Sequence, residues 1–196
     1  MKLAVVLGRL ALAAAALCSV AAHADAEAGR QKAQVCQSCH GDGGNSTQPM
    51  FPMLAGQPKQ FLVSALFQFR EGKRVNPVMS PMAANLSNKD LNDLADFFSS
   101  LKLQPPQGSI APERATQARE IAQRNNCTAC HTATLAGQQH IPRLAGQQRE
   151  YLATQLRAFR GSTRGELDGV MTSAAQALSP QDIELLSDYL ATLSAP

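Results

Sequence analysis

The feature that most constrains this 196-residue chain is a motif that occurs twice, Cys-x-x-Cys-His. The first copy spans residues 36–40 and the second spans residues 127–131. In such a motif two thiols attach one edge of a haem as thioethers, and the adjacent imidazole becomes the proximal iron ligand. One copy alone would also fit a thioredoxin-like redox pair or half of a zinc site. Two copies that both end in His predict two covalently bound c-type haems. The predicted attachment residues are Cys36, Cys39, Cys127 and Cys130, and the predicted proximal ligands are His40 and His131.

The N-terminal segment 1–24 has the pattern of a secretory signal peptide. Lys2 and Arg9 are its only charged residues, an apolar stretch follows, and Ala-His-Ala at 22–24 is a cleavage site. The apolar stretch is too short for a comfortable transmembrane helix. A lipoprotein anchor at Cys18 is the alternative, but Leu17 occupies the preceding position, where a small residue is expected. We therefore expect export to the periplasm and a mature chain, 25–196, whose only cysteines are the four haem thiols.

Charge and composition exclude some classes of partner. The formal net charge is +3, and two of the 18 basic residues lie in the predicted signal peptide, so the mature chain is almost neutral. It has no basic run, which argues against nucleic acid as a partner. The mature chain also lacks a predicted transmembrane segment. Trp is absent and aromatic residues make up 5% of the chain, so two buried macrocycles would supply the large groups of the core.

The two halves of the chain are a tandem repeat. Residues 52–57 match 142–147 as Pro-x-Leu-Ala-Gly-Gln, and residues 61–70 match 151–160. A Pro-, Gly- and Gln-containing stretch separates the halves and is typical of a linker. The predicted organisation is a signal peptide (1–24), a first domain (25–103), a linker (104–112) and a second domain (113–196).

Each half predicts helices joined by long irregular loops, and no stretch alternates like a strand, so the expected fold is all-α. The last helix of each half has a start signal, because Ser87 and Ser179 each precede an acidic residue by three positions. The loops are too long for a compact domain without a cofactor, and a haem would supply the missing core. The other predicted helices are 26–35 and 58–71 in the first half, and 113–125 and 148–160 in the second.

A second axial ligand would occupy the remaining coordination position of each iron. Such a closed iron cannot bind gas or peroxide, which leaves electron transfer as its chemistry. Met171 is the only Met after residue 82, and it aligns with Met79. Each lies about 40 residues after its motif His and just before the last helix, so we expect a loop to bring it to the distal haem face. Most methionines fill cores, but matched positions in a duplicated haem unit favour Met79 and Met171 as ligands.

The first half leaves an alternative open. Met82 aligns with Ala174 and competes with Met79, whereas Met53 aligns with Arg143. Met50 aligns with His140, but both follow the proximal His by only nine or ten residues, too few to cross to the other haem face. We therefore expect His140 to face solvent or the propionate side.

The surroundings of the two irons are predicted from the same repeat. A proximal His normally donates its second ring N–H to an acceptor, and the carbonyls of Pro52 and Pro142 are placed for that role. The alternative is that these prolines only stiffen a turn. Four arginines recur in both halves and would either pair with haem propionates or be solvated: Arg70, Arg74, Arg160 and Arg164.

Taken together, these motifs resemble a dihaem cytochrome c of the cytochrome c4 family. The resemblance covers essentially all of the mature chain and rests on the two Cys-x-x-Cys-His units, the Pro-x-Leu-Ala-Gly-Gln segments, the Phe-Arg ends of the middle helices and the Met-to-Leu-Ser segments. It implies two cytochrome c-like domains related by approximate twofold symmetry. It also implies His/Met ligation of each iron, by His40 with Met79 and by His131 with Met171. The segment before Met79 is two residues shorter than that before Met171, so Met82 stays an alternative.

The predicted function is that of a periplasmic electron carrier, a monomer or loosely membrane-associated, in a respiratory chain. Its expected partners are redox proteins, an electron-donor complex and, as the resemblance implies, a terminal oxidase. No residue is expected to act as acid, base or nucleophile. Two rivals remain: a haem enzyme, such as a dihaem peroxidase or a sulfur-compound dehydrogenase, and an electron-transfer subunit that stays bound to a respiratory complex.

Overall fold

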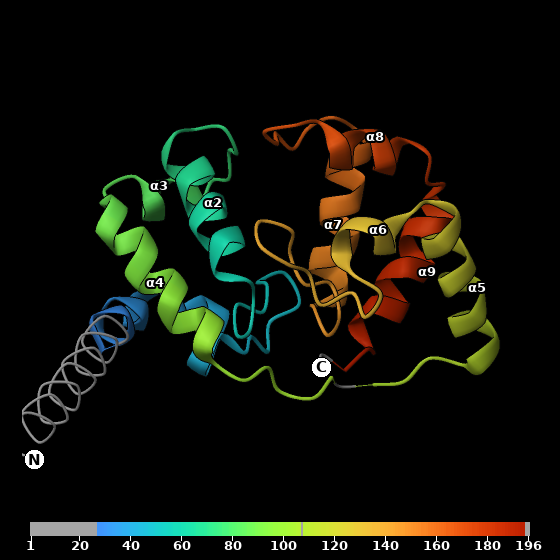
Figure 1. Ribbon diagram of the computed structural model, residues 1–196, viewed down its shortest axis with the longest axis horizontal. Helices are drawn as coiled ribbons and strands as arrows, with labels where there is room; N and C mark the ends of the chain where they lie inside the picture. Colours follow the sequence, from blue (N-terminus) through green and yellow to red (C-terminus); the bar gives the residue numbers. More distant parts are fainter. Residues whose placement is uncertain (1–26, 107, 195–196) are drawn as a thin grey trace, which may run out of the picture.

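The computed structural model describes residues 27–106 and 108–194, so the predicted signal peptide and Cys18 lie outside the described residues. Within these ranges the chain folds into helices and loops with no named strand, and its single β-bridge pairs Gln138 with Ile141. Figure 1 shows two helical halves side by side, with the N-terminal half in blue to green and the C-terminal half in yellow to red. The predicted all-α fold in two tandem domains is confirmed.

The first domain begins with a helix at residues 27–40, which we call the first described helix. It runs through the whole first Cys-x-x-Cys-His motif, so the prediction that the helix ends at residue 35 is wrong. Cys36 of the motif packs against the core cluster to which the last helix contributes Leu94 and Phe98, so tertiary contacts support the added turn. The elements that follow are η1 (Asp42–Gly44), α2 (Lys59–Arg70), α3 (Met79–Ala83) and α4 (Asn88–Ser100).

The second domain repeats the order of the α-helices with one break, and residues 108–194 contain no counterpart of η1. Its first helix ends at Arg124, and Asn126 adopts a left-handed backbone conformation before the helix of the second motif begins. Asn tolerates this conformation better than most residues. The elements are α5 (Pro112–Arg124), α6 (Cys127–His131), α7 (Arg149–Arg160), α8 (Val170–Gln176) and α9 (Pro180–Ala191).

The last helix of each domain begins at the predicted serine. Ser87 accepts a hydrogen bond from the N–H of Asp90, whose carboxylate accepts one from the N–H of Ser87. Ser179 and Asp182 form the same capping box, with Pro180 in the first turn. Each box satisfies two backbone donors that a helix start leaves without partners.

The middle and last helices pack together in each domain and build its core. α2 packs on α4, and α7 packs on α9. Both helix pairs are also joined by an ion pair at equivalent positions, Lys59 with Asp96 and Arg149 with Asp188. Each last helix buries large apolar side chains that recur three or four residues apart on one face. They are Leu91, Leu94 and Phe98 in α4, and Ile183, Leu186 and Leu190 in α9.

The first helix of each domain crosses the last one. In the first domain Gly29 makes this crossing close, because a Cβ there would lie 2.1 Å from the carbonyl oxygen of Asp93. Ala33, fully buried, packs beside Phe98 in the same cluster. In the second domain α5 packs on α9 through Ala118, which is also fully buried. Small residues therefore let both crossings approach closely.

The two domains are joined by a reciprocal exchange of hydrogen bonds between their Pro-x-Leu-Ala-Gly-Gln segments, which meet at the centre of Figure 1. The side chain of Gln57 accepts from the N–H of Arg143 at 3.0 Å and donates to its carbonyl at 3.0 Å. The side chain of Gln147 accepts from the N–H of Met53 at 2.7 Å and donates to its carbonyl at 3.0 Å. Both glutamines are buried. This exchange is symmetric, so equivalent residues of the two domains hold each other in place.

Candidate haem-binding sites

His40 ends the first described helix and is held by the loop that follows it. Its Nδ1 lies 2.9 Å from the carbonyl oxygen of Pro52, and the side chain is 5% exposed. A carbonyl only accepts hydrogen bonds, so Nδ1 carries the proton and donates it. Nε2 is therefore the nitrogen left to bind iron.

His131 repeats this arrangement at the end of α6. Its Nδ1 lies 2.8 Å from the carbonyl oxygen of Pro142, and it is 4% exposed. The prediction that Pro52 and Pro142 accept these bonds is confirmed. A bond of this kind fixes both the tautomer and the orientation of a ligating imidazole.

Burial also sets the protonation of both rings. It lowers the pKa of His40 and of His131 below the ordinary value, and the bonds to Pro52 and Pro142 oppose this effect only in part. The neutral imidazole, which is the form that binds metals, is therefore favoured at neutral pH.

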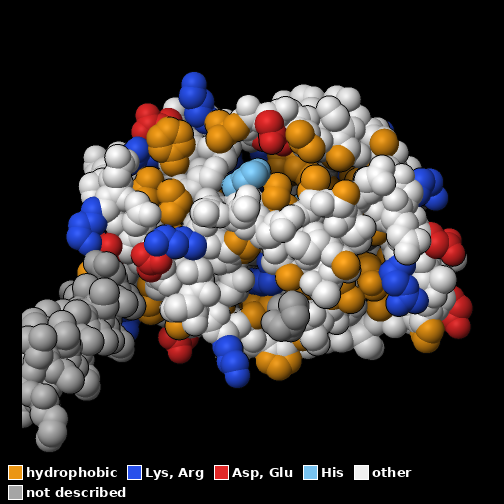
Figure 2. Space-filling view, viewed as in Figure 1, with side chains coloured by type: hydrophobic (Ala, Val, Ile, Leu, Met, Phe, Trp, Pro, Cys, Tyr) orange, Lys and Arg blue, Asp and Glu red, His pale blue; other side chains and the backbone are white. Residues whose placement is uncertain are grey.

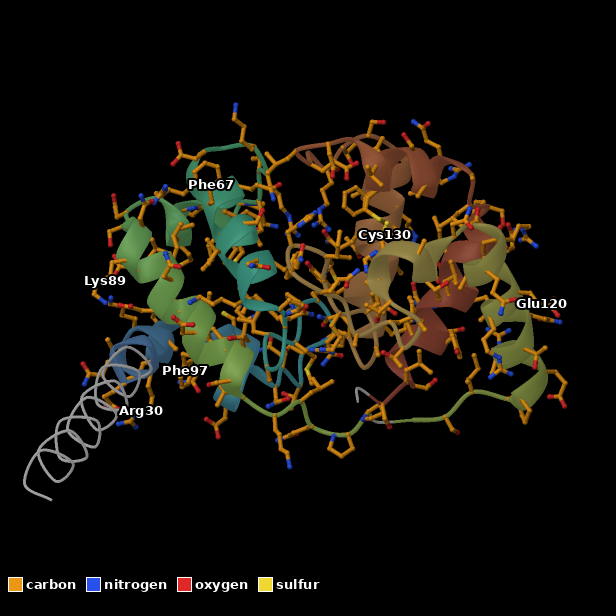
Figure 3. The ribbon with its side chains drawn as sticks, viewed as in Figure 1. Arg30, Phe67, Lys89, Phe97, Glu120 and Cys130 are labelled. Atoms are coloured by element: carbon orange, nitrogen blue, oxygen red, sulfur yellow. The ribbon has the colours of Figure 1, made fainter. Side chains whose placement is uncertain are left out.

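The four motif cysteines lie in two pairs, one in each domain. Cys36 and Cys39 are three residues apart on one helix, as are Cys127 and Cys130, and that spacing places both thiols on the same helix face. Before haem attachment, burial raises the pKa of Cys36 and of Cys127 and so favours their protonated thiol form. Cys130 lies on α6 (Figure 3) and is exposed.

The donor set fits a covalent haem. Each site offers two thiols on one helix face for the thioether bonds and one neutral imidazole, oriented through Nδ1, for the iron. A zinc site needs about four such ligands. Among residues 27–106 and 108–194, no group of three or more His, Cys, Asp or Glu residues comes together in a way that could hold a metal ion. These residues therefore supply no additional ligands that would complete a zinc site at either motif.

Met79 and Met171 occupy equivalent places at the start of short helices. Met79 is the first residue of α3, and Met171 is the second residue of α8. We expected loops here, and that expectation is wrong, because a short helix lies at each position and a side chain binds the N–H of each Met. The N–H of Met79 donates to Oδ1 of Asn76 at 2.8 Å, and the N–H of Met171 donates to Oε2 of Glu166 at 2.9 Å. Both methionines are half-buried.

The competing residues lie in different surroundings. Met82 is 43% exposed and Met50 is 56% exposed, whereas Met53 is buried at the domain interface. His140 is exposed, as expected for a residue facing solvent or the propionate side. Met79 and Met171 therefore match each other in position and burial, and each has its N–H bound by a side chain that precedes it in the chain.

The four recurring arginines divide into two kinds. Arg70 donates to the carbonyl of Leu86 at 2.9 Å, and Arg160 donates to the carbonyl of Leu178 at 2.8 Å. These two tie a middle helix to the loop before the last helix. Arg74 and Arg164, by contrast, lie at the domain interface with Gln155 of α7.

Comparisons with known proteins agree with this geometry. The family model for cytochrome c matches the chain twice, over residues 26–102 and 115–194. Cytochrome c4 of Pseudomonas aeruginosa is 38% identical over 183 residues, covering 86% of this chain and 90% of the relative. The crystal structure of reduced recombinant cytochrome c4 from Pseudomonas stutzeri superposes with a TM-score of 0.80 at 35% identity, covering 86% of this chain and 98% of that one. A thiosulfate dehydrogenase electron acceptor of Thiomonas intermedia is 33% identical, covering 87% of this chain and 84% of the relative.

Two helical domains with one Cys-x-x-Cys-His site each, matched twice by the cytochrome c model, define a c-type cytochrome with two haems that carries electrons. Because both the curated relatives and the solved structure match over most of their length, the chain belongs to the cytochrome c4 family. Its partners are redox proteins. Within the part of the chain that the structure describes, no helix has the length and apolar character needed to span a membrane.

Proposed function

We propose that both irons are closed by a His and a Met, His40 with Met79 and His131 with Met171. The observation that carries the proposal is the match between the two domains. Each imidazole is fixed by a proline carbonyl, and each Met lies in the first two residues of a short helix with its N–H bound by a side chain. A closed iron has no position for substrate, so we assign the chain electron transfer rather than catalysis. This assignment disfavours a haem peroxidase or dehydrogenase.

The residues around each iron support electron transfer because they keep the two axial ligands in fixed positions. Haem iron, when bound, supplies one-electron chemistry between its ferric and ferrous states. Pro52 and Pro142 keep the two imidazoles in one orientation, so the same ligand geometry serves both oxidation states. Asn76 and Glu166 fix the backbone of the two methionines. A thioether ligand raises the reduction potential, which suits a carrier that delivers electrons to an oxidant.

We further propose that the mature protein is the segment 25–196 in the periplasm, with a first domain at 25–103, a linker at 104–112 and a second domain at 113–196. The sequence of segment 1–24 supports export, and c-type haem motifs fit an exported chain. Apolar side chains reach the surface in both domains (Figure 2), including Val78 near Met79 and Val170 beside Met171. Weak, transient docking of redox partners at small surfaces is typical of such carriers.

The proposed electron acceptor is a respiratory terminal oxidase. The test uses the reduced holoprotein and membranes that contain an oxidase, and follows reoxidation of the haems by absorbance. Rapid reoxidation that an oxidase inhibitor abolishes is expected. Reoxidation at the rate of buffer alone would contradict the assignment.

A second role is favoured by the likeness to thiosulfate dehydrogenase electron acceptors. In that case the oxidised holoprotein would accept electrons from a thiosulfate-oxidising enzyme. The same absorbance assay distinguishes the two roles, with a thiosulfate dehydrogenase and thiosulfate replacing the oxidase membranes. Reduction in this assay without reoxidation by the membranes would favour the second role. Consumption of thiosulfate by the holoprotein alone would contradict both roles and indicate an enzyme.

A further inference from the structure

One peptide group in each domain is hydrogen-bonded on both of its sides. In the second domain this group joins Pro142 to Arg143. Its carbonyl oxygen accepts from Nδ1 of His131 at 2.8 Å, and its N–H donates to Oε1 of Gln57 at 3.0 Å. The C=O and the N–H of a trans peptide point in opposite directions. The peptide group therefore lies between the proximal histidine of its own domain and a glutamine of the other domain.

The first domain has the same arrangement in reverse. The peptide group that joins Pro52 to Met53 accepts from Nδ1 of His40 at 2.9 Å and donates to Oε1 of Gln147 at 2.7 Å. In both domains the histidine, the glutamine and the residue that carries the N–H are buried. We call each series of two bonds the histidine–peptide–glutamine chain. It connects each proximal histidine to a side chain of the opposite domain through a single peptide group.

Each glutamine is held in the orientation that its chain requires. Nε2 of Gln57 donates to the carbonyl of Arg143 at 3.0 Å, and Nε2 of Gln147 donates to the carbonyl of Met53 at 3.0 Å. A backbone carbonyl can only accept and a backbone N–H can only donate. These two partners therefore fix which end of the side-chain amide faces the N–H, and rotation of the amide would break both bonds.

A peptide group transmits polarisation from its N–H to its carbonyl oxygen. Resonance in the C–N bond shifts electron density toward the oxygen, and an acceptor at the N–H strengthens that shift, so hydrogen bonds in series reinforce one another. The proximal imidazole then donates to a more negative oxygen, which makes it a more basic ligand. A more basic ligand stabilises ferric iron and lowers the reduction potential, since hydrogen bonding beyond the ligands is one way in which a protein tunes a haem.

We propose that Gln57 and Gln147 are positioning residues that lower the reduction potential of the haem in the opposite domain. Gln57 acts on His131, and Gln147 acts on His40, in each case through the intervening peptide group. This inference rests on the proposed function only in using the two histidines as iron ligands. The potential of each haem therefore depends on the docking of the two domains.

The test is a redox titration of the holoproteins Gln57→Ala and Gln147→Ala, followed by proton NMR. Haem methyl resonances, assigned to each domain through their proximity to His40 or His131, report the two potentials separately. Gln57→Ala is expected to raise the potential of the second-domain haem and to leave that of the first-domain haem unchanged. Gln147→Ala is expected to do the reverse. Glutamines that only held the domains together would not produce this crossed pattern.

Gln148→Ala is the matched control. The side chain of Gln148 also crosses the interface, where Nε2 donates to the carbonyl of Ser46 at 2.5 Å, but this carbonyl belongs to neither histidine–peptide–glutamine chain. Both potentials are expected to stay unchanged in the control. A shift at the haem of the substituted domain, equal shifts at both haems, or no shift in the Gln57 and Gln147 variants would overturn the proposal.

A second measurement follows the hydrogen bond of the proximal histidine itself. In the reduced holoprotein the Nδ1 proton of each histidine has its own NMR resonance, which moves upfield when its hydrogen bond weakens. Gln57→Ala is expected to move the resonance of His131 and not that of His40. A shifted potential with this resonance unmoved would also overturn the proposal.

Gln57→Glu covers the case in which Gln57→Ala does not fold with both haems. Glu keeps an oxygen that accepts from the N–H of Arg143, and a carboxylate accepts a stronger bond than an amide. The potential of the second-domain haem is therefore expected to fall. An upward shift, or a larger shift at the first-domain haem, would overturn the proposal.

Spin state in the same samples separates this proposal from the proposed function. Low-spin haems whose potentials do not move in the glutamine variants contradict the histidine–peptide–glutamine chain alone. High-spin haem in the unsubstituted protein contradicts His/Met ligation.

Discussion

The two domains keep the same contacts around each proximal histidine, but the helix that leads into the haem motif differs between them. His40 and His131 lie 2.9 and 2.8 Å from their proline carbonyls. The capping boxes and the arginine-to-carbonyl bonds also recur. The first helix, however, is continuous through the motif in the first domain and broken before it in the second. What the duplication preserves is therefore the set of bonds that fixes the iron ligands, not the helix boundaries.

The domains also differ in what they give to their interface. The second domain supplies Tyr151, Gln155 and the buried Arg143, where the first has Phe61, Ala65 and Met53. Arg143 donates to the carbonyls of Ala55 and Ala145 and bridges both domains. Burial lowers its pKa to about 10. The polar chemistry of the interface thus comes mostly from the second domain, although the glutamine exchange is symmetric.

The largest expected effect is the loss of one axial ligand in one domain. Met171→Ala should convert one of the two haems to high spin, and Met79→Ala should do the same to the other, because an alanine leaves the iron open. Electron paramagnetic resonance of the oxidised holoproteins measures the fraction of haem that is high-spin. Met50→Ala is the control, since Met50 is 56% exposed. Conversion by Met82→Ala in place of Met79→Ala would break the equivalence of the domains.

The second largest expected effect is the loss of stability when one glutamine of the interdomain hydrogen-bond exchange is removed. Gln57→Ala leaves the buried N–H and carbonyl of Arg143 without partners, and Gln147→Ala does the same to Met53. Each unpaired buried group costs about 1–3 kcal/mol. Denaturant unfolding should therefore show similar losses of stability for both variants. Gln31→Ala, at an exposed pair with Glu27, should cost almost nothing. A loss in only one of the two variants would show that the exchange is not symmetric in energy.

The third effect compares the caps of the last helices. Ser87→Ala and Ser179→Ala each remove the side chain that accepts the N–H of an Asp three residues later. A lost N-cap costs about 1 kcal/mol. Equal losses in thermal unfolding are expected for the two domains, with Ser→Thr at the same positions keeping most of the stability. A cost at one cap only would indicate that tertiary contacts compensate for the other.

The smallest effect is a difference in acid sensitivity. Lys32 lowers the pKa of Asp90 below its ordinary value, and Ser87 adds to this, whereas Ser179 lowers that of Asp182. A lowered native pKa means that the folded state binds fewer protons than the unfolded state. The stabilisation is therefore fully present above the ordinary Asp pKa and is lost as pH falls from that value through the lowered native pKa.

Urea unfolding as a function of pH tests this difference. Asp90→Asn should flatten the loss of stability between about pH 5 and pH 2. Asp182→Asn should flatten it less, because Lys32 pairs with Asp90 at 2.6 Å while Arg124 lies 3.8 Å from Asp182. The reverse order of the two variants would contradict the assignment of Lys32 as the main cause.

Several parts of this structure could be predicted because their signals are local. Ser87 and Ser179 mark helix starts by spacing alone, and the repeat aligns Pro52 with Pro142 directly after each motif. The exchange by Gln57 and Gln147 could not be predicted, although both lie in the repeated segment. Their partners are backbone groups more than 80 residues away, and backbone partners leave no trace in the sequence.

The predictions of local structure that proved wrong also depend on contacts between residues that are distant in the sequence. The helix at 27–40 continues past its predicted end because packing against α4 favours it, and the turns at Met79 and Met171 are helical because Asn76 and Glu166 cap them. Arg70 and Arg74 look alike in the sequence, yet one binds a loop carbonyl and the other reaches the opposite domain. Such differences depend on tertiary contacts.

The central claim is that both irons are closed by a His and a Met. The most direct measurement is the spin state and ligation of the oxidised holoprotein, by electron paramagnetic resonance together with the methionine-to-iron charge-transfer band in the red region of the absorbance spectrum. Two low-spin signals and a charge-transfer band corresponding to two haems per chain are predicted. A high-spin fraction approaching half of the haem, or a band corresponding to one haem, would contradict the claim.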